Sequence, residues 1–228
     1  MVNDDLLSVQ DAARRLGIEP MSVRRHINAG SLSANKRGRD WLIDPASVER
    51  LARQRHGRGR ALAPHMAWAT LLLASDRGDD AQAIAGNVRY RSRAAAWLAA
   101  NPLAEHADRL RARATPERFD IHPAEAARLL AREDVMPTGI SAARPYQLIG
   151  GGGEVEVYAP AAARTAILNK HALSPASGPA LIRWIRDDLW PQIPRREDGS
   201  APERAVLVDL LENNDPRARR VAADALGT

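Results

Sequence analysis

Four side chains near the amino end have the types and spacing needed for hydrogen bonds to base edges and phosphates. They are Met21, Ser22, Arg24 and Arg25. An arginine fork can donate to O6 and N7 of guanine, a serine hydroxyl can donate or accept, and an apolar side chain can contact the methyl group of thymine. We therefore expect a nucleic-acid contact here, with Arg25 directed at bases and Arg24 at phosphate.

The residues around this group predict a helix that positions it. Pro20 suits the first helical position, where its missing N–H costs nothing, and Gly30 is expected to end the helix. Val23 and Ile27 form the predicted buried stripe. A rotation of about 100° per residue then places the outward set on the other side, with Arg24 on the flank. That outward set is Met21, Ser22, Arg25 and Asn28.

A shorter helix is predicted immediately before it. Ser8 followed three residues later by Asp11 is typical of a helix start, and Gly17 of a helix end. Apolar residues recur between them at helical spacing, ending at Leu16. Two short helices joined by a tight Gly-containing turn allow the second helix to lie in the major groove of DNA.

A basic hairpin and a third helix are expected next. Residues 32–34 and 41–43 are short strand-like runs on either side of a polar turn at 35–40. The turn carries Lys36, Arg37 and Arg39, which can enter a minor groove or bind the phosphate backbone. Asp44 and Pro45 then predict the cap of a helix that buries Val48 and Leu51.

The segment that holds these elements resembles the winged helix-turn-helix of the MerR/excisionase type. The residues that carry the resemblance are Leu7-Ser8-Val9-Gln10-Asp11-Ala12-Ala13-Arg14-Arg15-Leu16-Gly17-Ile18, then Ser22-Val23-Arg24-Arg25 and Ile27. The resemblance implies that residues 40–44 form the second strand of the wing and the cap of the third helix. The chain departs from the family pattern at Glu19, where the family has a Ser or Thr cap.

The excess of positive charge is confined to the same part of the chain. The 228 residues include 33 basic and 28 acidic side chains, a formal net charge of +5. Residues 1–60 hold 12 basic and seven acidic side chains, whereas residues 61–228 hold 21 of each sign. A local surplus of this kind attracts phosphate. Solvated helix charges at Arg24 and Arg25, and an ordinary exposed turn at the hairpin, are the alternatives; we favour DNA contact.

Composition excludes several classes of protein. There is no cysteine, which excludes a disulfide framework, a thiol nucleophile and cysteine-based zinc sites. Residues 1–7 contain two aspartates and no long apolar stretch, unlike a signal peptide. The most apolar segment, 66–74, is far too short to span a membrane. We expect a cytoplasmic protein with no membrane contact.

The rest of the chain predicts an α+β domain. Helical spacing is present at 63–74, 91–100, 104–114 and 124–132, with restarts expected at 115–117 and 122–123. A half-buried strand is predicted at 154–158, a helix at 160–173, a second strand at 181–185, a loop at 194–202, and helices at 205–212 and 216–226. The fold expected is mainly α with small β hairpins: a winged helix-turn-helix domain at 1–56, a hinge at 56–60, and a C-terminal α+β domain at 61–228.

Short motifs in this second region resemble actinobacterial regulators that are paired with nucleotidyltransferase-type toxins of the abortive-infection kind. They are residues 58–64 with Met66-Ala67-Trp68, His122-Pro123, residues 137–143, and residues 209–212 with 215–220. The resemblance implies an antitoxin that represses its own toxin–antitoxin operon, with a toxin protein as a possible partner.

Catalysis finds little support in the residue pattern. The histidines show none of the short spacings of a metal site; they are His26, His56, His65, His106, His122 and His171. No Gly-Lys-Ser or Gly-Lys-Thr follows the glycine run 150–153, and Ser141 lacks the flanking glycines of a nucleophile elbow. Asp187 and Asp188 are more typical of a turn than of a metal site. We expect no catalytic residue, cofactor or metal.

The function expected is that of a sequence-specific transcriptional regulator, specifically an antitoxin-type repressor, which binds double-stranded DNA as a homodimer. The second domain would bind a partner protein, self-associate, or both. Three alternatives stay open. The protein could be an excisionase-like factor that bends DNA, an enzyme with its site near Asp187 and Asp188, or an adaptor whose basic part binds RNA or acidic partners.

Overall fold

The computed structural model describes residues 6–28, 32–38, 40–55, 60–148, 154–176, 178–213 and 215–227. The chain divides into two compact units, Met1–Arg58 and Gly59–Thr228. The predicted helix end at Gly30, residues 56–59 of the predicted hinge, and the glycine run 150–153 lie outside the described residues.

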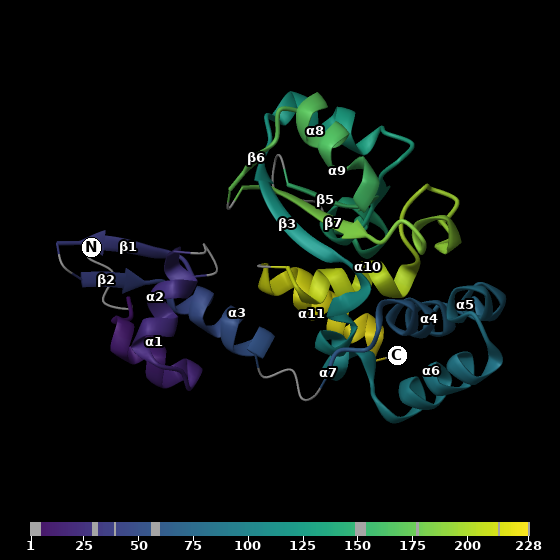
Figure 1. Cartoon of the computed structure of the whole chain (residues 1–228), viewed down its shortest axis with the longest axis horizontal. Helices are drawn as coiled ribbons and strands as arrows, with labels where there is room; N and C mark the ends of the chain where they lie inside the picture. The colour runs from purple at the N-terminus through teal and green to yellow at the C-terminus, as the bar shows by residue number, and fades with distance from the viewer. Residues whose placement is uncertain are drawn as a thin grey trace. The chain divides into compact units, whose positions relative to one another are not determined.

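The first unit contains three helices and a two-stranded hairpin (Figure 1). The elements are α1 (Val9–Leu16), α2 (Pro20–Asn28), β1 (Ala34–Arg37), β2 (Asp40–Ile43) and α3 (Pro45–Arg55). They enclose one small core, in which Ala12, Val23 and Ile43 are completely buried. Val48 and Leu51 on α3 complete it, as their spacing predicted.

The helix ends of this unit confirm the predicted capping. The Ser8 hydroxyl accepts a hydrogen bond from the Asp11 N–H at 3.1 Å, and Gly17 ends α1 in the left-handed conformation, with φ of 61°. The Asp44 carboxylate accepts from the N–H groups of Ala46 and Ser47, at 3.1 and 3.0 Å. These contacts satisfy N–H groups that the first turn of a helix otherwise leaves unpaired.

The hairpin forms where it was expected but with a shorter turn. Arg37 lies opposite Asp40, and Lys36 lies opposite Trp41. The prediction that the first strand covers 32–34 and that Lys36 and Arg37 lie in the turn is therefore wrong. The polar residues of β1 are extended because they pair with β2. Strand β2 is in turn held by buried Ile43, whose backbone N–H and C=O each form a 2.9 Å hydrogen bond with the backbone of Leu7.

The second unit contains a five-stranded mixed sheet rather than the small hairpins predicted (Figure 1). The strand order is β4-β5-β7-β3-β6. Strands β5 and β7 are parallel, and the other pairs are antiparallel. A parallel pair needs a crossover, and α9 (Arg164–Lys170) lies in it. The strands are β3 (Thr115–Asp120), β4 (Met136–Pro137), β5 (Val155–Pro160), β6 (Ser174–Pro175) and β7 (Ala180–Ile185).

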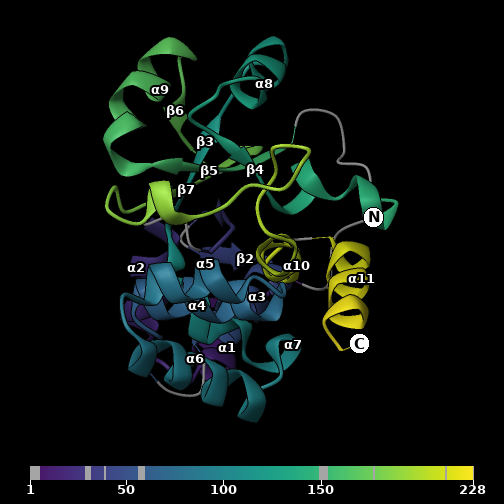
Figure 2. The same ribbon diagram turned by 90° about the vertical axis from the view of Figure 1, so that its right-hand side faces the viewer.

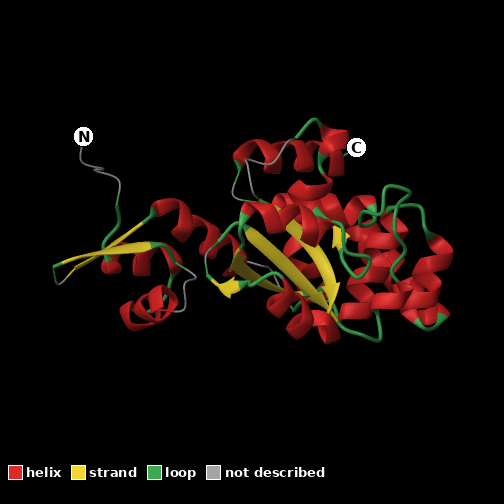
Figure 3. Ribbon diagram, turned by 90° about the horizontal axis from the view of Figure 1, so that it is seen from above, coloured by secondary structure: helices red, strands yellow, loops and turns green. Residues whose placement is uncertain are grey.

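Helices cover both faces of this sheet (Figures 2 and 3). Helices α8 (Pro123–Leu130) and α9 lie on one face, where Val155 and Val157 are buried. Helix α10 (Glu203–Leu211) lies on the other face, near buried Tyr158. Strand β5 is consequently buried along its length, and the prediction of a half-buried strand is wrong. Its polar residues alternate toward α10 instead of toward solvent.

A helical layer completes the unit. Its members are α4 (Pro64–Ala74), α5 (Gly78–Ala85), α6 (Val88–Ala100), α7 (Leu103–His106) and α11 (Pro216–Leu226). Helix α4 is apolar on all sides and contains Trp68, which is completely buried, so this helix belongs to the core. The short 3₁₀ turns are Ala107–Arg113, Gly139–Ala142, Arg144–Tyr146, Ala161–Ala163 and Trp190–Gln192.

Two other parts of this unit differ from the prediction. Residues 115–117, expected to restart a helix, begin β3, which is held on both sides by β7 and β6 although only Phe119 in it is buried. The helix expected over 104–114 is the short α7 followed by a 3₁₀ turn. Helix α5 was not predicted. Its few apolar residues, such as Ile84, are buried against α4, and a short segment shows little periodicity by itself.

Candidate nucleic-acid interface

Helix α2 is held by a narrow apolar contact with α1 and the hairpin. Val23 is completely buried, and Ile27 packs against the same core. At the end of α1, the N–H groups of Gly17 and Ile18 donate hydrogen bonds to the carbonyl groups of Arg14 and Ala13, at 3.3 and 3.1 Å. These hydrogen bonds turn the chain sharply, so that α2 begins three residues after Gly17.

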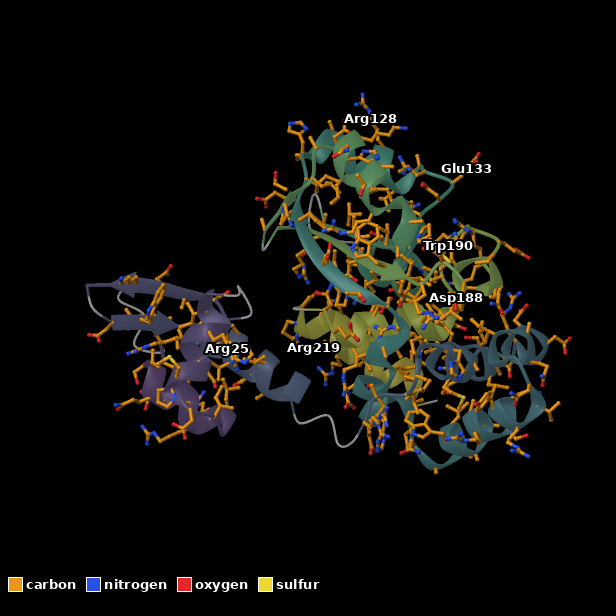
Figure 4. The ribbon with its side chains drawn as sticks, in the orientation of Figure 1. Arg25, Arg128, Glu133, Asp188, Trp190 and Arg219 are labelled. Carbon is orange, nitrogen blue, oxygen red and sulfur yellow. The ribbon has the colours of Figure 1, made fainter. Side chains whose placement is uncertain are left out.

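The opposite side of α2 is open to solvent. Met21 is 73% exposed, an unusual value for a large apolar side chain, and Arg24 and Arg25 are exposed beside it. Figure 4 labels Arg25 in the helical part of the unit. The structure thus brings three of the predicted site residues onto one solvent-facing surface of one helix. The side chain of Asn28, predicted to join them, lies outside the described side chains.

Ser22 differs from its predicted environment. It is partly buried and lines a surface depression between α1 and α2, together with Gln10, Arg14 and Glu19. The carbonyl of Glu19 accepts hydrogen bonds from the N–H groups of Ser22 and Val23, at 2.9 and 3.3 Å. Gln10 and Arg14 are four residues apart on α1, and this spacing could have pointed to them as further polar residues beside α2.

The hairpin adds one described cation to this unit. Lys36 is exposed, and its ammonium nitrogen lies 5.9 Å from the centre of the Trp41 ring on the paired strand. This contact is a cation–π interaction that keeps the stem of the side chain against the strand. The Arg37 side chain and the whole of Arg39, the other two cations predicted at the hairpin, lie outside what the structure describes.

The described cations of this unit that have no carboxylate partner lie on α1, α2 and the hairpin. On α1, Arg14 forms an ion pair with Asp11. The pKa of the Asp11 carboxyl is held below its ordinary value, first by a hydrogen bond from the Ser8 hydroxyl and then by Arg14. Among the described residues, Arg15 on α1, Arg24 and Arg25 on α2, and Lys36 on the hairpin have no such partner. Unpaired cations of this kind can neutralise phosphates and release the counterions bound to them.

The catalytic candidates of the second unit are engaged in structural contacts. Asp188 forms an exposed ion pair with Arg186, and the Asp187 carboxylate accepts from the Ala162 N–H at 2.8 Å (Figure 4 labels Asp188). The Ser141 hydroxyl accepts from the Glu156 N–H at 2.9 Å. Within the described ranges, no three acidic or histidine side chains gather as a metal site would need.

A buried cluster of charges in this unit was not predicted. We call Arg113, Arg183, Asp209 and Glu212 the buried ion cluster. Asp209 is completely buried and accepts hydrogen bonds from both guanidinium groups. Burial raises the pKa of its carboxyl, but Arg183 and Arg113 outweigh that effect and hold the pKa below its ordinary value. The arginines reach it from a 3₁₀ turn and from β7, so no local sequence pattern links them.

Glu156 lies beside this cluster with an incomplete set of partners. Its Oε1 accepts from the Asn213 amide at 3.1 Å, whereas its buried Oε2 has no hydrogen-bond partner among the described residues. Gly139, in the left-handed region with φ of 47°, leaves the space that Oε2 of Glu156 occupies, since a Cβ atom there would overlap that oxygen. Burial raises the pKa of Glu156 to about 7, against a smaller lowering by Arg183.

Comparison with known protein families gives a match over the first unit. Residues 6–56 match a family described as a helix-turn-helix domain. Comparison with curated proteins and with solved structures finds no match for the chain. The first unit is therefore a helix-turn-helix domain, a class that binds DNA, in agreement with the exposed cations of α2. In the part of the chain that the structure describes, none of the helices is long and apolar enough to cross a membrane.

Proposed function

We propose that the protein is a sequence-specific transcriptional regulator in which α2 is the recognition helix. One observation carries this proposal: α2 is anchored by Val23 and turns Met21, Arg24 and Arg25 to solvent, and neither arginine forms an ion pair with a residue that the structure describes. A helix that is packed on one side and carries exposed cations on the other suits the major groove, which admits an α-helix.

Each exposed residue then has a distinct role. Arg25 donates its fork to a guanine, and Met21 contacts a thymine methyl group. Arg24 binds phosphate, while Ser22 and Asn28 supplement the contacts at the edge of the helix. Lys36, with Arg37 and Arg39, binds the neighbouring backbone or minor groove as a wing.

We further propose that the second unit serves association and not catalysis. It has an extensive core of its own, and its candidate acids Asp187 and Asp188 are held by Ala162 and Arg186. The resemblance to regulators paired with nucleotidyltransferase-type toxins supports an antitoxin that represses its own operon. Homodimerisation would place two recognition helices on repeated half-sites. Cytoplasmic action follows from this proposal.

The role in a toxin–antitoxin pair is tested in cells. The product of the adjacent gene, expressed alone, should arrest growth, and co-expression of this protein should restore it. A harmless neighbouring product would exclude the antitoxin role and leave the regulator proposal standing. For the enzyme alternative, Asp187→Asn should leave the cellular activity of the protein unchanged.

DNA reading is tested with Arg25→Ala and Arg24→Ala as a matched pair. Arg25→Ala should cost about 1–3 kcal/mol of discrimination between the promoter and a duplex with the contacted base pair changed. Arg24→Ala should instead weaken binding to all duplexes and reduce the salt slope by about 0.9. Fluorescence anisotropy over a series of salt concentrations measures both. Equal losses on every duplex for Arg25→Ala would contradict its base-reading role, and strong bending without sequence preference would favour an architectural factor.

A further inference from the structure

Helix α6 presents a second basic surface, in the unit that lacks the helix-turn-helix domain. Only Ala94 of its 13 residues is buried. The helix lies at the opposite end of the unit from α8 and α9 (Figures 1 and 2). Val88 is 69% exposed and Tyr90 is 37% exposed. We call the exposed residues at its start the α6 basic face: Val88, Arg89, Tyr90, Ser92 and Arg93.

The arginines of the α6 basic face carry uncompensated charge. Between residues 81 and 104 the chain contains three arginines and no acidic residue. Arg89 forms no ion pair among the described residues, and the guanidinium of Arg93 lies 5.8 Å from the centre of the Tyr90 ring. Two exposed arginines of this unit, Arg128 and Arg186, differ in that each has a carboxylate partner.

The face is held in place from behind. The ring of Tyr90 lies 5.3 Å from that of His65 on α4, and the Asn87 side chain caps the helix by accepting from the Tyr90 N–H at 2.9 Å. Arg89 and Arg93 are four residues apart and therefore neighbours on the helix surface. Ordered neighbours lose less entropy when they bind a ligand together than two unrelated surface side chains do.

We propose that the α6 basic face binds the sugar–phosphate backbone of duplex DNA, in addition to the contacts made by α2. Arginine, tyrosine and serine are among the side chains that donate hydrogen bonds to phosphate oxygens. The contact is independent of sequence, because these donors reach the backbone and not base edges. This inference rests on the proposed function, since it concerns a duplex that the first unit also binds.

Charge complementarity favours DNA over a second copy of the chain. Pairing two α6 basic faces would bring arginines together on a helix that has no carboxylate to compensate them. Duplex DNA instead supplies one negative charge per roughly 1.7 Å of its axis. Arginine held over an aromatic ring keeps its N–H fork available at the edge, so the cation–π contact with Tyr90 is compatible with phosphate binding.

The test is the salt dependence of DNA affinity for the full chain carrying Arg89→Gln and Arg93→Gln together. Glutamine is nearly as good a helix former as arginine, so α6 is retained. The control is Arg128→Gln with Arg186→Gln, which removes the same charge from arginines that are already paired. Loss of two phosphate contacts should reduce the slope of log affinity against log salt by about 1.8 and weaken binding roughly 30-fold at 0.15 M salt.

The losses should be equal on promoter and random duplexes, and the control should retain the wild-type slope. Arg89→Lys with Arg93→Lys should also retain most of it, because lysine keeps the charge. A wild-type slope in the glutamine variant, or a loss confined to the promoter, would overturn the inference. So would loss of self-association with the slope unchanged, measured by sedimentation. Failure of the proposed function is distinguishable, since the wild-type chain itself would then show no duplex binding at low salt.

Discussion

Arg25 in the first unit and Arg183 in the second are the same residue in opposite environments. Arg25 is exposed on α2 and forms no ion pair within the described ranges, whereas Arg183 is 2% exposed on β7 and donates to Asp209 at 2.9 Å. Both lie on regular elements whose other side is buried. They differ in what lies over the side that carries the arginine. Helix α10 covers that side of β7, whereas no described element covers that side of α2.

This difference explains why the net charge of a segment points to the exposed arginines of α2 but not to the buried ion cluster. The second region is electrically neutral, and part of that neutrality consists of ion pairs that are inside the protein. Removing a charge from water costs several kcal/mol per ion, and a buried pair is compensated only by good geometry and further hydrogen bonds. Arg113 and Arg183 are therefore structural, whereas Arg24 and Arg25 on α2 and Arg89 and Arg93 on α6 are exposed and have no carboxylate partner in the described part of the chain.

The largest effect is expected from Asp209→Asn. The change removes the fully buried one of the two carboxylates that Arg113 and Arg183 share and leaves them with Glu212 alone, which costs about 3–5 kcal/mol of the free energy of unfolding of the second unit. Urea unfolding followed by tryptophan fluorescence measures it, since Trp68 and Trp184 are buried in this unit.

Two variants bracket this result. Asp188→Asn removes an acid from an exposed pair and should leave the unfolding midpoint almost unchanged. Thr138→Val removes a single neutral donor to the Asp209 carboxylate and should cost about 1–2 kcal/mol. Equal effects for Asp209→Asn and Asp188→Asn would show that burial does not distinguish the two arginine environments.

The next effect concerns pH and is expected from Glu156→Gln. Burial raises the pKa of Glu156 to about 7 in the folded chain, so the folded state binds a proton more tightly than the unfolded state between the ordinary glutamate pKa and pH 7. The stabilisation that the raised pKa of Glu156 contributes is fully present below the ordinary glutamate pKa, and it is lost as the pH rises from there through about 7. The neighbouring groups of the cluster and Arg118 set the balance.

Glutamine resembles the protonated acid and cannot titrate. The stability of the variant relative to wild type should therefore rise by about 2–3 kcal/mol between pH 5 and pH 8. Urea midpoints at the two pH values measure it, and the difference between proteins removes the contributions of other titrating groups. A constant difference across this range would mean that Glu156 is ionised in the folded state at both pH values.

The sequence predicted what local chemistry determines. Ser8, Gly17 and Asp44 act within a few residues along the chain, and the helix ends they predicted are confirmed. The exposure of Met21, Arg24 and Arg25 followed from helical periodicity alone. These are short-range effects, with a stated periodicity or a single hydrogen bond as their cause.

The predictions that were wrong concern structure that depends on pairing between distant segments of the chain. Glu156 alternates with valines as on a half-exposed strand, and only the packing of α10 over it makes the strand fully buried. Pro116 and Glu117 argue against a strand locally, yet β3 forms because β7 supplies its hydrogen-bonding partner. The hairpin turn was misplaced for the same reason, since Lys36 is extended by its pairing with Trp41.

The smallest effect sharpens the comparison by making the same kind of change once in each unit. Ser8 caps α1 in the first unit, and Asp215 caps α11 in the second by accepting from the Arg217 N–H at 2.9 Å. Ser8→Ala and Asp215→Ala should each cost about 1 kcal/mol, because each frees one N–H in the first turn of its helix. Amide hydrogen exchange resolved by residue should show Ser8→Ala accelerating exchange in α1 to α3 alone, and Asp215→Ala in the second unit alone. If either variant accelerated amide exchange equally in both units, the two units would unfold together. The exposed and buried arginines would then belong to a single cooperative structure.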